Sequence, residues 1–106
     1  MTRLEHLLII FAEECSEIAQ ETAKALRFGI DEQRDLPTSN RERISYEFSQ
    51  LMAMKAMLEA EGVHIPIDLA VMNEKQEKVE KYLLYSKECG TLDDTHTNTI
   101  EPINGE

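Results

Sequence analysis

The chain has 106 residues, of which 42% are hydrophobic and 30% are charged. This length allows one domain at most, and the composition is typical of a folded chain and excludes an intrinsically disordered one. The formal net charge of −10 argues against nucleic acid or an anionic membrane as a partner, whereas divalent cations are compatible with it.

The first predicted element is a helix over residues 3–27. Thr2 and Glu5 have the spacing of a capping box, and Gly29 follows as a stop. The run "LLIIFA" inside it is too short to span a bilayer, and no cleavage site of a signal peptide follows it. One stripe of the helix carries residues at the helical period, namely Leu4, Leu7, Leu8, Phe11, Cys15, Ile18, Thr22, Ala25 and Leu26.

A loop over residues 30–39 and a second helix from Asn40 to Gly62 are expected next. Ser39 and Glu42 offer a second capping box. The apolar stripe of this helix consists of Ile44, Phe48, Leu51 and Leu58. Lys55 falls within the stripe, where it either extends its ammonium group to solvent or meets an acidic group or a phosphate.

The third predicted helix runs over residues 68–88, after the connector "VHIPID", with Gly90 at its end. Its apolar side consists of Leu69, Met72, Val79, Tyr82 and Leu83. The fold class is therefore all-α, an antiparallel bundle of three main helices over residues 1–92. Three helices make a thin core, so we expect homo-oligomerisation to complete it.

The remaining residues, 93–106, form a polar C-terminal tail that we expect to be flexible. The two cysteines, Cys15 and Cys89, have neither CxxC nor zinc-site spacing, which is typical of reduced thiols. We therefore expect a cytoplasmic protein.

Acidic residues gather on the first helix. Glu13, Glu14 and Glu17 lie within "EECSE", and Glu21 follows one turn later. At 100° per residue, Glu14, Glu17 and Glu21 share a sector of about 60° at the edge of the apolar stripe. The cluster is either an ordinary solvated face or a site for a cation.

The second helix repeats this geometry, with Glu47 at the edge of its stripe and Gln50 one turn later. Antiparallel packing could bring Glu14, Glu17 and Glu47 to one seam. Partly buried carboxylates repel one another and need a counter-charge. Oxygen ligands suit Mg²⁺ or Mn²⁺, so a metal site is the functional alternative to a solvated face.

The third helix carries Lys75, Lys78 and Lys81, with Tyr82 and Tyr85 beside them. These lysines either pair with neighbouring glutamates in solvent or form phosphate contacts opposite an acidic metal site.

Together these segments resemble the MazG-like all-α nucleoside triphosphate pyrophosphohydrolases, in particular their small single-domain phage-type branch. That family has an EExxE motif on one helix and an ExxD motif on the next. The first motif is present as "EECSE", and "AKALRFG", "NRERI" and "KVEKYLLYSKECGTL" are similar to family segments. The resemblance covers residues 4–92. The second motif departs from the pattern, since "EFSQ" places Gln50 where the family has aspartate.

The resemblance implies cleavage of a nucleoside or deoxynucleoside triphosphate to the monophosphate and pyrophosphate. Glu14, Glu17 and Glu47 would hold Mg²⁺ or Mn²⁺, with Glu13 orienting or activating water and Glu21 a candidate replacement for the missing aspartate. The implied substrate-binding residues are Arg27, Lys75, Lys78, Lys81, Tyr82 and Tyr85. The resemblance also implies a homodimer or homotetramer. One subgroup of similar size, MazZ, cuts dGTP in phages.

Two other functions fit the sequence. One is a nucleotide-binding relative whose turnover is weak because Gln50 replaces the aspartate. The other is a helical interaction protein whose acidic patch is only surface. No residue pattern indicates a preference among bases or sugars.

Overall fold

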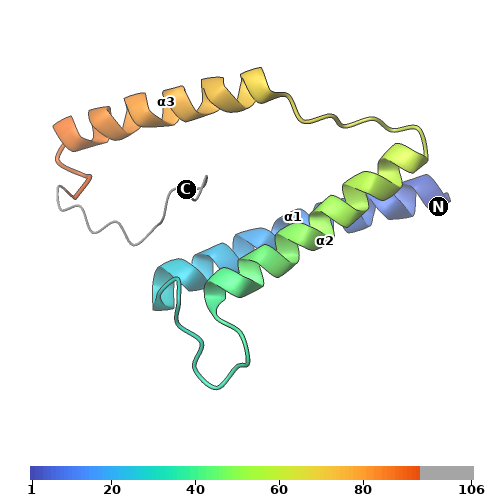
Figure 1. The fold of residues 1–106 in the computed structure, drawn as a ribbon, viewed down its shortest axis with the longest axis horizontal. Coiled ribbons are helices and arrows are strands. Elements are labelled where there is room, and N and C mark those ends of the chain that lie inside the picture. The colour runs from blue at the N-terminus through green and yellow to red at the C-terminus, as the bar shows by residue number, and fades with distance from the viewer. Residues whose placement is uncertain (94–106) are drawn as a thin grey trace. The chain divides into compact units, whose positions relative to one another are not determined.

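The computed structural model describes residues 1–93, which contain three helices and no strand (Figure 1). They are α1 (Arg3–Phe28), α2 (Asn40–Ala60) and α3 (Leu69–Glu88). The all-α prediction is therefore confirmed. The chain divides after Pro66 into two units, the first holding α1 and α2 and the second holding α3. Apart from Asp93, the predicted tail over residues 93–106 lies outside the described residues.

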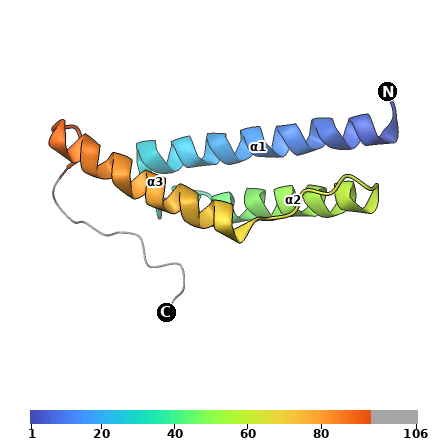
Figure 2. The same ribbon diagram turned by 90° about the horizontal axis from the view of Figure 1, so that it is seen from above.

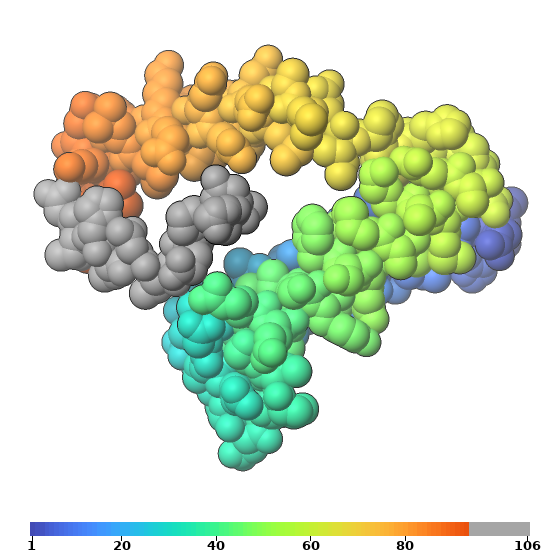
Figure 3. Space-filling model, in the orientation of Figure 1, coloured from blue at the N-terminus to red at the C-terminus, as the bar shows by residue number. Residues whose placement is uncertain are grey.

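Within the first unit, α1 and α2 run side by side in opposite directions, as Figures 1 and 2 both show. Residues 29–39 connect them and project from one end of the helix pair (Figure 3). The predicted antiparallel packing is thus seen for these two helices. Homo-oligomerisation stays a prediction.

Both predicted capping boxes are present. Thr2 Oγ1 accepts a hydrogen bond from the Glu5 amide at 3.1 Å, and the Glu5 carboxylate accepts one from the Thr2 amide at 2.7 Å. Ser39 and Glu42 exchange the same pair of bonds at 3.2 and 2.8 Å. These bonds satisfy amide donors that lack a partner in the first turn, so the local sequence fixes where each helix begins.

The apolar core lies near the start of α1 and the end of α2. It consists of the buried residues Leu7, Met54 and Leu58, and Leu58 is fully buried. Residues that pack partly buried against this cluster are Leu4, Phe11, Val63 and Ile65. The segment after α2 therefore folds back over the core and contributes to it.

On α1, the face that packs against α2 is rotated from the predicted stripe. Leu8 and Cys15 are exposed, and Leu26 is 88% exposed. Partly buried Glu14 and Glu21 lie on the inner face instead. A stripe drawn from hydrophobicity alone excludes acids, so it placed the centre of the packing face too far toward Leu8, Cys15 and Leu26.

On α2 the prediction placed Phe48 in the core, but it is 52% exposed, whereas Met54, which the prediction left out, is buried. Lys55 is held by an acid, since its Nζ lies 2.8 Å from Glu59 Oε2. The same Glu59 oxygen accepts a hydrogen bond from the Ile65 amide at 3.2 Å. Glu59 therefore ties α2 to the segment that follows it, and Lys55 neutralises the Glu59 carboxylate.

The second unit contributes α3, which begins at Leu69 because Asp68 caps it by accepting a hydrogen bond from the Val71 amide at 3.1 Å. The helix contains no buried residue, and the apolar side predicted from Leu69, Met72, Val79, Tyr82 and Leu83 is exposed. None of the helices in residues 1–93 has the length and apolar character needed to cross a bilayer.

Candidate functional site

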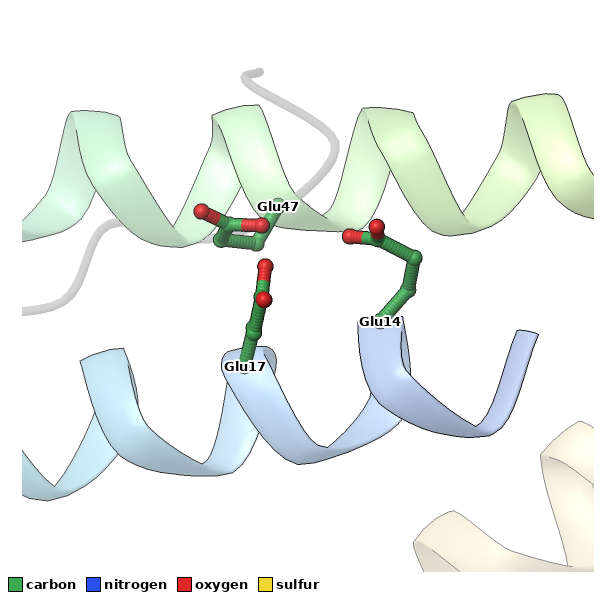
Figure 4. A group of neighbouring side chains, drawn as sticks. All are labelled: Glu14, Glu17 and Glu47. Atoms are coloured by element: carbon green, nitrogen blue, oxygen red, sulfur yellow. The ribbon is translucent and has the colours of Figure 1, made fainter. Parts of the chain in front are cut away.

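Three carboxylates meet where α1 faces α2. Glu14 and Glu17 project from adjacent turns of α1, and Glu47 projects toward them from α2 (Figure 4). One carboxylate oxygen from each of the three lies within 4.8 Å of the others. The helical period places two acids on one face, and the antiparallel packing supplies the third from across the seam. The structure therefore brings together the three residues that the sequence singled out.

The seam partly excludes water from this cluster. Glu14 and Glu47 are partly buried, while Glu17 is exposed. Oε1 of Glu14 and Oε1 of Glu47 are both buried without a hydrogen-bond partner. A buried carboxylate oxygen without a donor is costly, so these two oxygens have coordinating capacity that the surrounding protein does not use.

Electrostatics at the cluster disfavour three negative charges. Removal from water raises the pKa of Glu47 above its ordinary value, and the adjacent carboxylates of Glu17 and Glu14 raise it further. Within residues 1–93, no arginine or lysine forms an ion pair with any of these three acids. The cluster therefore lacks a protein counter-charge, and the chemistry of its donor set suits a hard divalent cation.

Two other carboxylates with a shifted pKa have cationic partners. A hydrogen bond from Arg41 lowers the pKa of Asp31, and a hydrogen bond from Lys55 lowers that of Glu59. These two acids are accounted for as parts of structural ion pairs. The three-carboxylate cluster differs from these two acids because no arginine or lysine of residues 1–93 pairs with it.

Glu21 lies on the same face of α1 but is not part of the cluster. Its carboxylate pairs with Arg43 Nε of α2 at 3.4 Å and with Lys24 Nζ at 3.3 Å. Because two cations already hold it, the structure does not place it in the position of the missing aspartate. Glu13 is exposed beside the cluster, and Gln50 is partly buried one turn after Glu47.

The residues that the resemblance assigned to substrate are spread over both units. Arg27 lies at the end of α1, about 15 Å along the helix axis from Glu17. Lys75 and Lys78 line one hollow on α3. The other three, Lys81, Tyr82 and Tyr85, are exposed on α3. All five of these α3 residues belong to the second unit, whereas the cluster belongs to the first.

Sequence reasoning missed Arg43 and Tyr46. A hollow of about 320 Å³ lies against the cluster and is lined by Thr38, Glu42, Arg43, Tyr46 and Glu47. Arg43 precedes Glu47 by one helical turn, so this spacing was a signal that could have found it. Tyr46 is 61% exposed and offers an aromatic surface next to an acid of the cluster.

No protein-family model, curated protein or solved structure matches the chain.

Proposed function

We propose that this chain is a metal-dependent nucleotide pyrophosphohydrolase, which cuts nucleoside or deoxynucleoside triphosphates between the α and β phosphates. One observation carries the proposal: Glu14, Glu17 and Glu47 converge from two helices, and two of their oxygens are buried without a donor. Such a cluster needs a positive charge, and Mg²⁺ is commonly held by carboxylates together with substrate phosphates. The motif order on α1 and α2 supplies the reaction class by resemblance to the MazG-like family.

In the proposed reaction, water attacks the α phosphorus. A bond forms between the water oxygen and the α phosphorus, the bond to the bridging oxygen breaks, pyrophosphate leaves, and a proton is released to solvent. A divalent cation would neutralise charge on the phosphates and would activate the attacking water. Glu14, Glu17 and Glu47 would hold that cation, and exposed Glu13 would orient the water.

Substrate would enter beside the cluster. The hollow that includes Tyr46 and Arg43 supports this assignment, because it offers an aromatic surface and a guanidinium group next to Glu47. Lys75, Lys78, Lys81, Tyr82 and Tyr85 of α3 are proposed contacts of the phosphates and the nucleoside. A preference for guanine nucleotides, as in MazZ, is part of the same proposal.

Association into a homodimer or homotetramer in the cytoplasm completes the proposal. Two features support it: the outer side of α1 exposes Leu8 and Leu26, and α3 has no buried residue. Exposed apolar faces of this kind commonly mark an association surface.

A second candidate is nucleotide binding without efficient turnover. Two observations favour it, namely that Gln50 stands where the family has aspartate and that Glu21 is held by Arg43. An amide oxygen can coordinate a cation but contributes no charge, so fewer ions would be held.

The test is to incubate the full chain with each common NTP and dNTP, with Mg²⁺ or Mn²⁺, and to identify the products. Pyrophosphate and a monophosphate are expected. Glu17→Gln should lower the rate by more than about 100-fold, because it removes a ligand charge from an exposed position without disturbing the core. Glu61→Gln, at the far end of the hairpin, makes the same charge change and should retain the rate.

Three results would contradict the proposal. Release of single phosphate groups would refute the cleavage position. A wild-type rate in Glu17→Gln would refute the site. Nucleotide-dependent thermal stabilisation without product would establish the binding protein instead.

A further inference from the structure

A second pocket lies at the loop end of the α1–α2 hairpin, away from the carboxylate cluster. It has a volume of about 310 Å³. The lining residues that matter for its chemistry are Lys24, Arg27, Phe28, Arg34, Asn40 and Arg43. All of them come from the end of α1, the connecting loop and the start of α2, so the pocket is contained within one unit.

The pocket is cationic in an acidic chain. Its lining carries four positive side chains and one acid, Glu32, which pairs with Arg34 at 3.4 Å. Glu21, which does not line the pocket, pairs with two of these cations, Lys24 and Arg43. Two positive charges remain after both acids are counted, whereas the whole chain has a net charge of −10. The guanidinium group of Arg27 forms no ion pair with any of residues 1–93.

The aromatic ring of Phe28 lies against two of these cations. The guanidinium carbon of Arg34 lies 4.1 Å from the ring centroid, and that of Arg27 lies 5.2 Å from it. Cation–π contacts of this kind hold a guanidinium group without neutralising its charge. Both arginines are therefore oriented. The N–H donors of Arg27 stay available to an anion, while Arg34 also pairs with Glu32 through its Nε.

Asn40 holds the pocket wall in place. It is 1% exposed, and its Nδ2 donates to the carbonyl of Gly29 at 2.7 Å and to Glu32 Oε1 at 3.2 Å. Arg43 donates to Asn40 Oδ1 and to the carbonyl of Thr38. The loop is thus fixed at both ends by buried polar contacts, which is the arrangement that a preorganised binding site needs.

Arg34 adopts a left-handed backbone conformation with φ of 52°. This region is unfavourable for residues with a Cβ and is commonly occupied at ligand-binding positions. In this conformation the Arg34 guanidinium lies over the ring of Phe28.

We propose that this pocket binds a phosphate or pyrophosphate group without a metal ion, at a site separate from the carboxylate cluster. Guanidinium groups match phosphate oxygens in a two-point geometry, and Lys24 adds a point charge at the same wall. Glu17 and Arg27 are about 15 Å apart along α1, so one phosphate group cannot contact both. The inference stands whether or not the chain hydrolyses nucleotides.

The test is a titration of the full ¹⁵N-labelled chain with pyrophosphate, phosphate or a nucleoside monophosphate, all in EDTA. Amide shifts are expected at Phe28, Gly29 and Arg34 and not at Glu14 or Glu47. Pyrophosphate should bind more tightly than phosphate because it carries more charge. If the nucleoside monophosphate binds more tightly than phosphate at the same amides, the ligand of the pocket is a nucleotide. If the two bind equally, the ligand is the free anion.

Two variants probe the pocket, and one serves as a control. Arg27→Gln keeps a good helix former, and Arg34→Asn suits the left-handed conformation. Each should weaken pyrophosphate binding by about tenfold or more, since each removes a charge-assisted contact. Arg3→Gln, at the other end of the hairpin, makes the same charge change and should weaken binding less than about twofold.

Three results would overturn the inference. They are absence of pyrophosphate binding in EDTA, shifts centred on the carboxylate cluster, and an equal effect of Arg3→Gln and the two pocket variants. Because EDTA removes divalent cations and no cleavage is measured, none of these results bears on the proposed hydrolysis. Circular dichroism of each variant confirms that the helices are retained.

Discussion

Replacing Glu47 by glutamine should stabilise the chain when metal is absent and destabilise it, relative to wild type, when metal is present. Glu47 lies within 4.8 Å of both Glu14 and Glu17, measured between carboxylate oxygens. At such a separation each pair of charges repels by about 1 kcal/mol even at the dielectric constant of water. Salt and the exposure of Glu17 weaken this repulsion. We therefore expect Glu47→Gln to remove about 1 kcal/mol of repulsion in total.

In EDTA at pH 7, that relief should raise the melting temperature by about 5 °C for a chain of this size. With Mn²⁺ at about 100 times its dissociation constant, binding stabilises wild type by about 2.7 kcal/mol, which exceeds the relief. The order of the two melting temperatures should therefore invert when Mn²⁺ replaces EDTA. Glu13→Gln makes the same charge change on an exposed neighbour outside the cluster and should show no inversion.

The pH dependence follows from the raised pKa of Glu47. The folded chain binds this proton more tightly than the unfolded chain does, so the repulsive cost is fully present above the folded pKa. It disappears as pH falls below the ordinary value of 4.5, where the carboxyl is protonated in both states. The advantage of Glu47→Gln in EDTA should therefore be present at pH 7 and lost near pH 4.

Differential scanning fluorimetry over this pH range, in EDTA and in Mn²⁺, measures each quantity. Equal or lower stability of Glu47→Gln in EDTA at pH 7 would show that the carboxylates do not repel one another. Equal stabilisation of variant and wild type by Mn²⁺ would show that the cation binds elsewhere. Either result would refute the reasoning.

Two further predictions concern stability. Asn40→Ala should lower the free energy of unfolding by about 2 kcal/mol in urea, because it removes the buried amide that donates to the Gly29 carbonyl and to Glu32. A change below about 0.5 kcal/mol would mean that water replaces the side chain. Leu58→Ala should lower the same quantity by about 3 kcal/mol, since it opens a cavity at the fully buried position of a small core, and a loss under about 1 kcal/mol would show that the core collapses around the gap.

Local sequence signals predicted the helix boundaries well. The capping pairs at Thr2 and Ser39 act through neighbours three residues away, so the sequence alone contains the whole interaction. The packing face depends on the partner helix and could not be predicted in the same way. Glu21 faces inward to Arg43 of α2, and Glu14 lies beside Glu47 of the same helix; no property of α1 alone specifies either neighbour.

The site shows the same division. Helical spacing was enough to place Glu14 and Glu17 on one face, and antiparallel packing was enough to add Glu47. The partner of Glu21 could not be predicted, because Arg43 reaches it across the seam from another helix. The cationic pocket was also missed, since Arg34 acquires its role from a backbone conformation that the loop imposes.

The position of the apolar core has a consequence for how the hairpin forms. Its members lie far from the connecting loop, and Arg3 and Glu61, which form an ion pair at the same end, are 58 positions apart in the chain. The contacts nearest the loop are polar, so they do not supply hydrophobic stabilisation when the loop first closes. Chain entropy must therefore be lost across the whole hairpin before apolar burial offsets it. Docking of this pair of helices should therefore resemble the joining of two distant segments, because the chain between them loses its entropy before the core forms.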